Sequence, residues 1–183
     1  MRRLSIALVH HPVLDAAGKA GTSTLTTIDV HDLSRSARTY GCEGFYIVHP
    51  IEAQQKLAHR IVEHWTHGSS AKRIPDRKDA LAIARVVSTL DDAQKACGEG
   101  TELWVTAARS VGQPTTWAAA RGVLAADGPP VLLVFGTSWG LAPEVTGRAN
   151  TVLEPIHGAG DWNHLSVRAA CAIALDRLVV ART

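Results

Sequence analysis

Short runs of consecutive apolar residues are the feature that most restricts how this chain can fold. Val131–Phe135 is entirely apolar, follows Pro129 and Pro130, and runs into a glycine. Because such a run buries both of its faces, it is typical of a strand inside a parallel sheet. Gly44–Val48 and, apart from Ser5, Leu4–Val9 have the same character. The runs therefore predict a sheet that is covered on both sides.

Helical patterns separate these apolar runs. Amphipathic spacing predicts helices over Val30–Tyr40, Ile51–Trp65, Thr115–Ala126, Pro143–Ala149 and Leu165–Val180. The first of these is expected to be capped by Asp29. Two further helices are expected, one at the start of Asp76–Arg85 and one capped by Ser88. Further strands are expected at Ile83–Val87, Leu103–Thr106 and Val152–Ile156, and loops at residues 10–24 and 66–77. The alternation predicts an α/β protein with a mostly parallel sheet and helices on both faces. No linker divides the chain, so residues 1–183 are expected to form one domain.

Composition removes several classes of protein. Apolar residues make up 46% of the chain and charged residues 20%, which is unlike a disordered chain or a coiled coil. No apolar run approaches the ~20 residues that cross a bilayer, so we expect no membrane contact and a cytoplasmic location. The three cysteines show no C-x-x-C spacing, so neither a disulfide nor a metal site is expected.

Three loops are placed where chemistry is expected. Ligands of open parallel sheets bind at the carboxyl ends of the strands, and loops 107–112, 136–141 and 156–166 follow predicted strands. Each loop combines small residues, which allow close backbone approach, with polar groups. The P-loop, the G-x-G-x-x-G fingerprint and the G-x-S-x-G elbow are all absent. Their absence argues against an NTPase, a common dehydrogenase and a hydrolase.

Three segments, Val131–Leu141, Ile156–Ser166 and Asp29–Gly41, together resemble the motifs of the SPOUT superfamily of RNA methyltransferases. Val131–Leu141 (VLLVFGTSWGL) is similar to the second motif, in which an apolar strand runs into a small-residue loop. Ile156–Ser166, followed by an Ala-rich helix, resembles the third motif, and Asp29–Gly41 resembles the first. The resemblance covers about residues 25–180. The subgroup it suggests is a bacterial domain similar to tRNA guanine-N1 methyltransferase.

The resemblance implies a deep trefoil knot in the C-terminal half, a homodimer, and S-adenosyl-L-methionine (SAM) held by backbone groups of the loops. The residues that it places around the cofactor are Thr106, Ala107, Phe135, Gly136, Thr137, Trp139, Gly140, Leu141, Ile156, His164, Leu165 and Ser166. Small residues allow backbone groups to read the adenine edge, and Leu141, Ile156 and Leu165 offer it an apolar slot. Trp139 has an alternative role in packing.

The resemblance also assigns candidate catalytic residues. Arg35 matches the arginine of the first motif, and Asp161, Asn163 and His164 lie in the third loop. Methyl transfer needs an aligned nucleophile and one proton acceptor, and the candidates for the acceptor are Asp29, Asp161 and His164. Asp29 and His164 stand where ribose-methylating relatives usually carry Asn, which leaves the target atom open. Each residue also has a structural alternative: a helix cap for Asp29, a loop contact for His164, a surface position for Arg35.

The function predicted on this basis is SAM-dependent methylation of RNA, either tRNA or rRNA, at a base nitrogen or a ribose 2′-OH. An inactive knotted module that binds RNA or a partner enzyme and retains a SAM pocket is the alternative. A small-molecule enzyme is disfavoured by the missing phosphate fingerprints. The cations expected to meet RNA phosphates are Arg35, Arg38, Arg73, Arg77 and Lys78.

Overall fold

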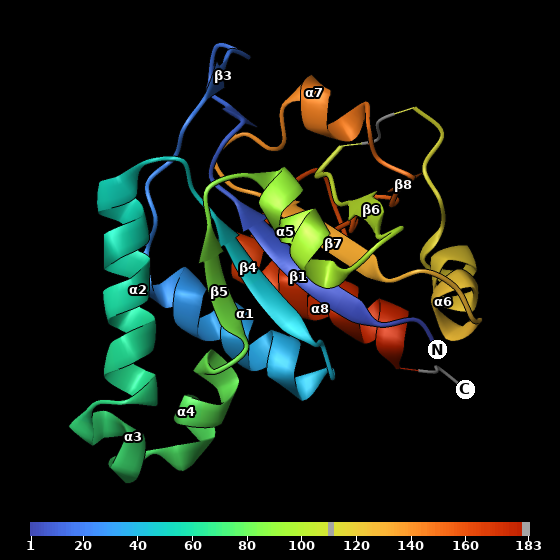
Figure 1. The fold of residues 1–183 in the computed structure, drawn as a ribbon. Coiled ribbons are helices and arrows are strands. Elements are labelled where there is room, and N and C mark those ends of the chain that lie inside the picture. Colours follow the sequence, from blue (N-terminus) through green and yellow to red (C-terminus); the bar gives the residue numbers. More distant parts are fainter. Residues whose placement is uncertain (110–111, 181–183) are drawn as a thin grey trace.

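The computed structural model describes residues 1–109 and 112–180 (Figure 1). Ser110 and Val111 of the first expected loop lie outside the described residues, as do residues 181–183 of the expected domain. Six parallel strands form the main sheet in the order β5-β4-β1-β7-β6-β8. Their bounds are β1 Leu4–Val9, β4 Gly44–Val48, β5 Ala84–Val87, β6 Glu102–Val105, β7 Val131–Gly136 and β8 Thr151–Val152. The α/β class and the parallel sheet are therefore confirmed.

Helices cover both faces of this sheet. Their bounds are α1 Thr27–Thr39, α2 Glu52–Thr66, α3 Ser69–Arg73, α4 Pro75–Leu81, α5 Leu90–Cys97, α6 Trp117–Ala125, α7 Pro143–Thr146 and α8 Val167–Val179. Helices α1, α2, α6 and α8 contribute to the core on one face, and α5 and α7 to the core on the other. In Figure 1, α5 lies in front of the sheet, and α1 and α8 lie behind it.

The central strand β1 shows why the apolar runs form a buried sheet. Leu4, Ile6 and Leu8 point into the core on the side of α1 and α8. Ala7 and Val9 point into the core on the side of α5. Because successive side chains of a strand alternate between faces, a strand that is buried on both sides is almost entirely apolar, and Ser5 is the one polar residue of β1.

Several predicted boundaries were wrong by one or more residues. Thr26, not Asp29, caps α1, because its hydroxyl accepts the backbone N–H of Asp29. Likewise Thr89, not Ser88, caps α5 and forms a reciprocal capping box with Asp92. Strand β8 is only two residues long, and residues 66–77, expected as a loop, contain α3 and the start of α4.

The segment 10–24, also expected as a loop, forms a short hairpin. Strand β2 (Val13–Leu14) pairs antiparallel with β3 (Ala20–Gly21). The hairpin contacts the loop after β7, where the backbone N–H of Leu14 donates to the carbonyl of Gly140 at 2.8 Å. This contact joins the N-terminal and C-terminal halves of the chain at the carboxyl ends of the strands.

The C-terminal helix α8 returns across the sheet and packs on α1, α6 and β7. The expected knot, which depends on how the chain threads, stays a prediction. Within the described ranges, no helix is long and apolar enough to cross a bilayer.

Candidate functional site

A cavity of about 990 Å³ opens at the carboxyl ends of β1, β6 and β7. Its walls come from the three expected loops, the hairpin segment, and the first turns of α1 and α8. The lining includes every residue that we expected around the cofactor: Thr106, Ala107, Phe135, Gly136, Thr137, Trp139, Gly140, Leu141, Ile156, His164, Leu165 and Ser166. Segments far apart in the chain thus converge on one hollow, as is usual for small-molecule sites.

A second hollow of about 400 Å³ is less suited to a ligand. It is lined by residues of α2 and of the turn that follows it, among them Arg60, His64 and His67. One helix and its end cannot enclose a small molecule, and no strand end reaches this position. We therefore place the site at the larger cavity.

The loop after β7 is folded tightly against itself. A side chain at Gly136 would place its Cβ 2.7 Å from the backbone nitrogen of Leu141 and 2.9 Å from the Cγ of Leu141. Gly140 has a φ of 106°, and Ser138 adopts a φ of 55°, which is rare for a residue with a side chain. The loop therefore presents backbone groups to the cavity and has no room for a bulkier residue at Gly136.

A chain of hydroxyl groups lies beneath this loop. The Thr137 hydroxyl donates to the carbonyl of Val9 at 3.1 Å, so it can only accept from Ser23, whose oxygen is 2.5 Å away. The Ser23 hydroxyl then accepts from His10 Nδ1 at 2.9 Å. A single carbonyl thereby fixes the direction of three hydrogen bonds and the tautomer of His10.

His10 and a neighbouring histidine are kept neutral at this position. The imidazole rings of His10 and His49 stack with 5.1 Å between their centroids. Burial, together with the neighbouring His49, lowers the pKa of His10 to about 4, although the Asp29 carboxylate opposes the shift. Burial also lowers the pKa of His49. The stacked pair of imidazoles below the loop after β7 is therefore uncharged near neutral pH.

An ion pair that the sequence analysis missed forms part of the wall. Arg168 on α8 donates to a carboxylate oxygen of Asp29 at 2.6 Å. The other oxygen of Asp29 accepts from the Thr26 hydroxyl at 2.5 Å. Arg168 also lies 3.6 Å from Asp32. Asp29 is thus an anchor for the guanidinium rather than a free base, and Arg168 brings a positive charge to the cavity. The sequence feature that could have indicated this charge is the single cation, Arg168, in the first turn of an Ala-rich helix.

The third loop closes the cavity on its far side. The Asn163 side chain donates to the carbonyl of Ala108 at 3.4 Å, which links the third loop to the first. The Ser166 hydroxyl caps α8 by accepting from the Ala169 N–H at 3.2 Å. Glu154, which the sequence analysis did not single out, lines the cavity and accepts from the Trp117 N–H at 2.8 Å.

The expected catalytic residues divide into two pairs. Asn163 and His164 line the cavity. Arg35 and Asp161 are not among its lining residues. The Arg35 side chain is 61% exposed on α1 and is 3.9 Å from Asp32. The structure of one chain thus brings two of the four expected residues to the cavity.

Comparisons with known proteins agree with this geometry. The sequence model of a family described as "SAM-dependent RNA methyltransferase" matches residues 3–180. A "tRNA (guanine-N(1)-)-methyltransferase" of Nitratidesulfovibrio vulgaris is 41% identical over 182 residues, which cover 97% of this chain. The same alignment covers 42% of that relative, so the chain spans less than half of its length.

Solved structures show the same fold. A "probable methylase family protein" from Haemophilus influenzae has a TM-score of 0.64 at 20% identity, and the match covers 97% of this chain and 65% of that one. The "SpoU Methyltransferase AviRb" from Streptomyces viridochromogenes has a TM-score of 0.58 at 16% identity, over 97% of this chain and 58% of that one. The fold resembles that of SPOUT proteins, as the three motifs suggested.

Proposed function

The chain belongs to the family of SAM-dependent RNA methyltransferases, and from this premise we propose that its cavity transfers a methyl group from SAM to tRNA. The observation that carries the proposal is the convergence of all twelve expected cofactor residues on one cavity. The choice of tRNA follows the name of the Nitratidesulfovibrio relative. A base nitrogen and a ribose 2′-OH both remain open as the target atom.

The residues of the cavity fit SAM. Its adenine ring needs an apolar slot, for which Leu141, Ile156 and Leu165 are available. Its sulfonium and ammonium groups are positive, and the carboxylates of Asp29 and Glu154 also line the cavity. When bound, SAM supplies an already activated methyl group, so the protein needs only to align the nucleophile and to accept one proton.

The chain's own side chains divide these tasks. We assign proton acceptance to the imidazole of His164, which lines the cavity and carries a ring nitrogen that can act as a base. Asn163 holds the third loop against the first, which fixes the position of its neighbour His164. Arg168, anchored by Asp29, can hold a phosphate of the RNA by two parallel hydrogen bonds. Misalignment of the nucleophile by about 1 Å can reduce such a rate by ~100-fold.

We further propose that the chain acts as one domain, with a knotted C-terminal half, in a homodimer in the cytoplasm. Support for the dimer comes from α8, where Ala169, Ala172 and Ile173 remain half-buried after α8 has packed on α1 and α6. Arg35, exposed on the adjacent α1, would then face the partner's cavity rather than its own. Sedimentation of a stable monomer at micromolar concentration would contradict this arrangement.

Substitution of a glycine tests the cofactor site. Gly136→Ala adds only a Cβ, which would lie 2.7 Å from the Leu141 backbone, so the loop must shift. We expect calorimetry to show SAM binding at about micromolar strength in the wild type and at least tenfold weaker binding in the variant. Gly122→Ala on α6 is the matched control, because a Cβ there meets no other atom within 4 Å. Equal SAM affinities in all three proteins would refute the assignment of the cavity.

A further inference from the structure

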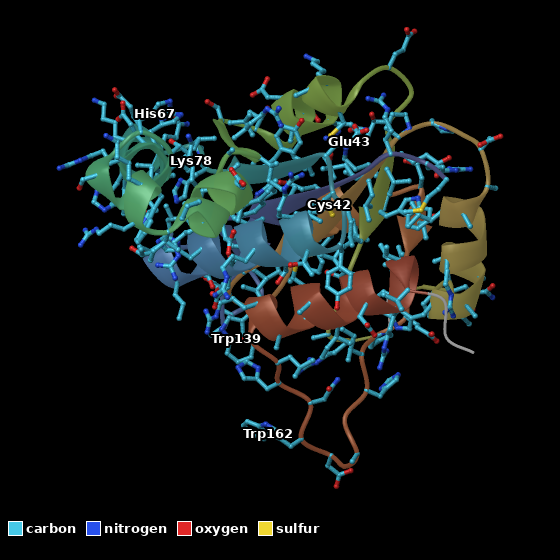
Figure 2. The ribbon with its side chains drawn as sticks, turned by 90° about the horizontal axis from the view of Figure 1, so that it is seen from below. Cys42, Glu43, His67, Lys78, Trp139 and Trp162 are labelled. Carbon is cyan, nitrogen blue, oxygen red and sulfur yellow. The ribbon has the colours of Figure 1, made fainter. Side chains whose placement is uncertain are left out.

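Two of the five tryptophans stand in solvent at the edge of the cavity. Trp139 is 66% exposed and Trp162 is 81% exposed, whereas Trp104 and Trp117 are buried and Trp65 is half-buried. Figure 2 shows Trp139 and Trp162 at the same lower edge of the molecule. Single exposed apolar side chains are ordinary on protein surfaces. Two exposed indoles, one in the cavity lining and one in ring contact with the lining residue His164, suggest a binding role rather than a packing role.

The backbone that carries each indole is constrained. The N–H of Trp139 donates to the carbonyl of Leu14 at 3.1 Å, so the hairpin holds this residue in place. In the third loop, a Cβ at Gly158 would lie 2.9 Å from the carbonyl oxygen of Trp162. The chain is therefore folded closely around Trp162 as well. A ligand that stacks on a ring carried by such a backbone loses less conformational entropy than one that must order a free loop.

Both rings are connected to the cavity. Trp139 is one of the lining residues. Trp162 is not, but its ring meets the ring of His164 edge to face at a centroid distance of 6.0 Å, and His164 lines the cavity. A group stacked on Trp162 would therefore lie beside the imidazole to which we assign proton acceptance.

We propose that Trp139 and Trp162 are stacking platforms for unpaired bases of the RNA substrate, beside the methyl-transfer cavity. The inference rests on the proposed function, because it names how the same site holds its RNA. Sequence-specific recognition of RNA usually involves unstacked bases that lie on aromatic side chains. An enzyme that modifies a base must also take that base out of its stack.

The surroundings of the indoles favour a nucleic acid over a second copy of the chain. The neighbours of Trp162 in the loop are polar: Asp161, Asn163 and His164. Interfaces between subunits are more apolar than this at their centre. Arg109, exposed and also in the cavity lining, is a guanidinium that can meet a phosphate. The half-buried apolar side of α8 offers a separate surface for a second copy.

The test compares variants in their affinity for a single-stranded RNA of about 12 nucleotides, measured by fluorescence anisotropy with saturating S-adenosylhomocysteine. Trp162→Ala should weaken RNA binding by at least about fivefold, the lower limit for one stacked base. Trp162→Phe, which keeps a π face, should restore most of the affinity. Val123→Ala on α6 is the matched control, since Val123 is exposed but does not line the cavity.

Two further readouts separate stacking from other roles. The slope of log affinity against log salt should not change in Trp162→Ala, because stacking releases no counterions. The affinity for S-adenosylhomocysteine should also stay the same, since Trp162 does not line the cavity. Trp139→Ala should weaken RNA binding in the same way.

RNA affinity of Trp162→Ala equal to that of Val123→Ala would overturn the proposal. If that variant instead shifted sedimentation toward smaller species, the indole would belong to an interface with a second copy, and the proposal would again be wrong. A wild-type protein that binds S-adenosylhomocysteine but no RNA would overturn the proposed function as well. The failure of this inference alone is therefore distinguishable from the failure of both.

Discussion

The buried imidazole of His10 predicts a loss of stability in mild acid. His10 has no exposed surface, and burial, with the neighbouring His49, lowers its pKa from 6.5 to about 4 in the folded protein. At a pH between these two pKa values, the imidazole of His10 is protonated in the unfolded chain and neutral in the folded protein. The free energy of unfolding is therefore highest above pH 6.5 and falls as the pH decreases toward 4.

The size of this loss follows from the two pKa values. A shift of one unit corresponds to about 1.4 kcal/mol, so the full difference is worth roughly 3 kcal/mol below the lower pKa. At about pH 5 the unfolded chain is almost fully protonated and the folded protein is not, so about 2 kcal/mol is already lost. A loss of that size is a large part of the 5–15 kcal/mol that stabilises an ordinary domain.

Equilibrium unfolding in urea, at about pH 7.5 and about pH 5, measures this loss. The variant His10→Asn is the control, because its side-chain amide can donate to Ser23 as His10 Nδ1 does but has no proton to gain. Contributions that the two proteins share cancel in the difference between their losses. We expect the wild type to lose about 2 kcal/mol more than His10→Asn between the two pH values. Equal losses would refute the neutral, buried His10 and the hydrogen-bond chain that begins at it.

Two further predictions concern the arginines near the cavity. Arg168→Ala leaves Asp29 without its guanidinium, so we expect methyl transfer to fall by at least tenfold and the free energy of unfolding by roughly 1–3 kcal/mol. Urea unfolding and methyl-transfer rates measure the two effects. If neither the stability nor the rate changes in Arg168→Ala, the ion pair has no role in either. Arg35→Ala should leave unfolding and SAM affinity intact yet reduce transfer by about 100-fold, with little rescue by Arg35→Lys. Arg3→Ala is its control, because Arg3 is also an exposed arginine beside a surface carboxylate and does not line the cavity. Full activity of Arg35→Ala would show that Arg35 has no catalytic role.

The sheet was predictable because its signal is local. The apolar run Val131–Phe135 lies within one strand, and burial on both faces requires nothing from distant residues. The hairpin at residues 13–21 carries no such signal, since it is held by Gly140 and Leu141, more than a hundred residues along the chain. Helix caps were predicted at the wrong residue where a neighbour can cap a helix equally well, as with Ser88 beside Thr89.

The candidate site also contains residues that could be predicted from local sequence and residues that could not. Loop residues such as Gly136 and Ile156 were predictable because they follow strands whose carboxyl ends meet at one edge of the sheet. The pair of Arg168 and Asp29, separated by 139 residues, depends on how α8 packs against α1. The chain from His10 depends on the hairpin. No local pattern in the sequence could place either of them.

Methyl transfer to RNA tests the central claim most directly. The protein would be incubated with SAM carrying a labelled methyl group and with bulk tRNA or rRNA from a strain that lacks the gene, and the digested nucleosides would be analysed by mass spectrometry. We predict one labelled nucleoside from tRNA, strongly reduced with Gly136→Ala and unchanged with Gly122→Ala. Fragmentation would assign the label to the base or the ribose. A protein that binds SAM but labels no RNA would contradict the account and would support an inactive module that only retains the pocket.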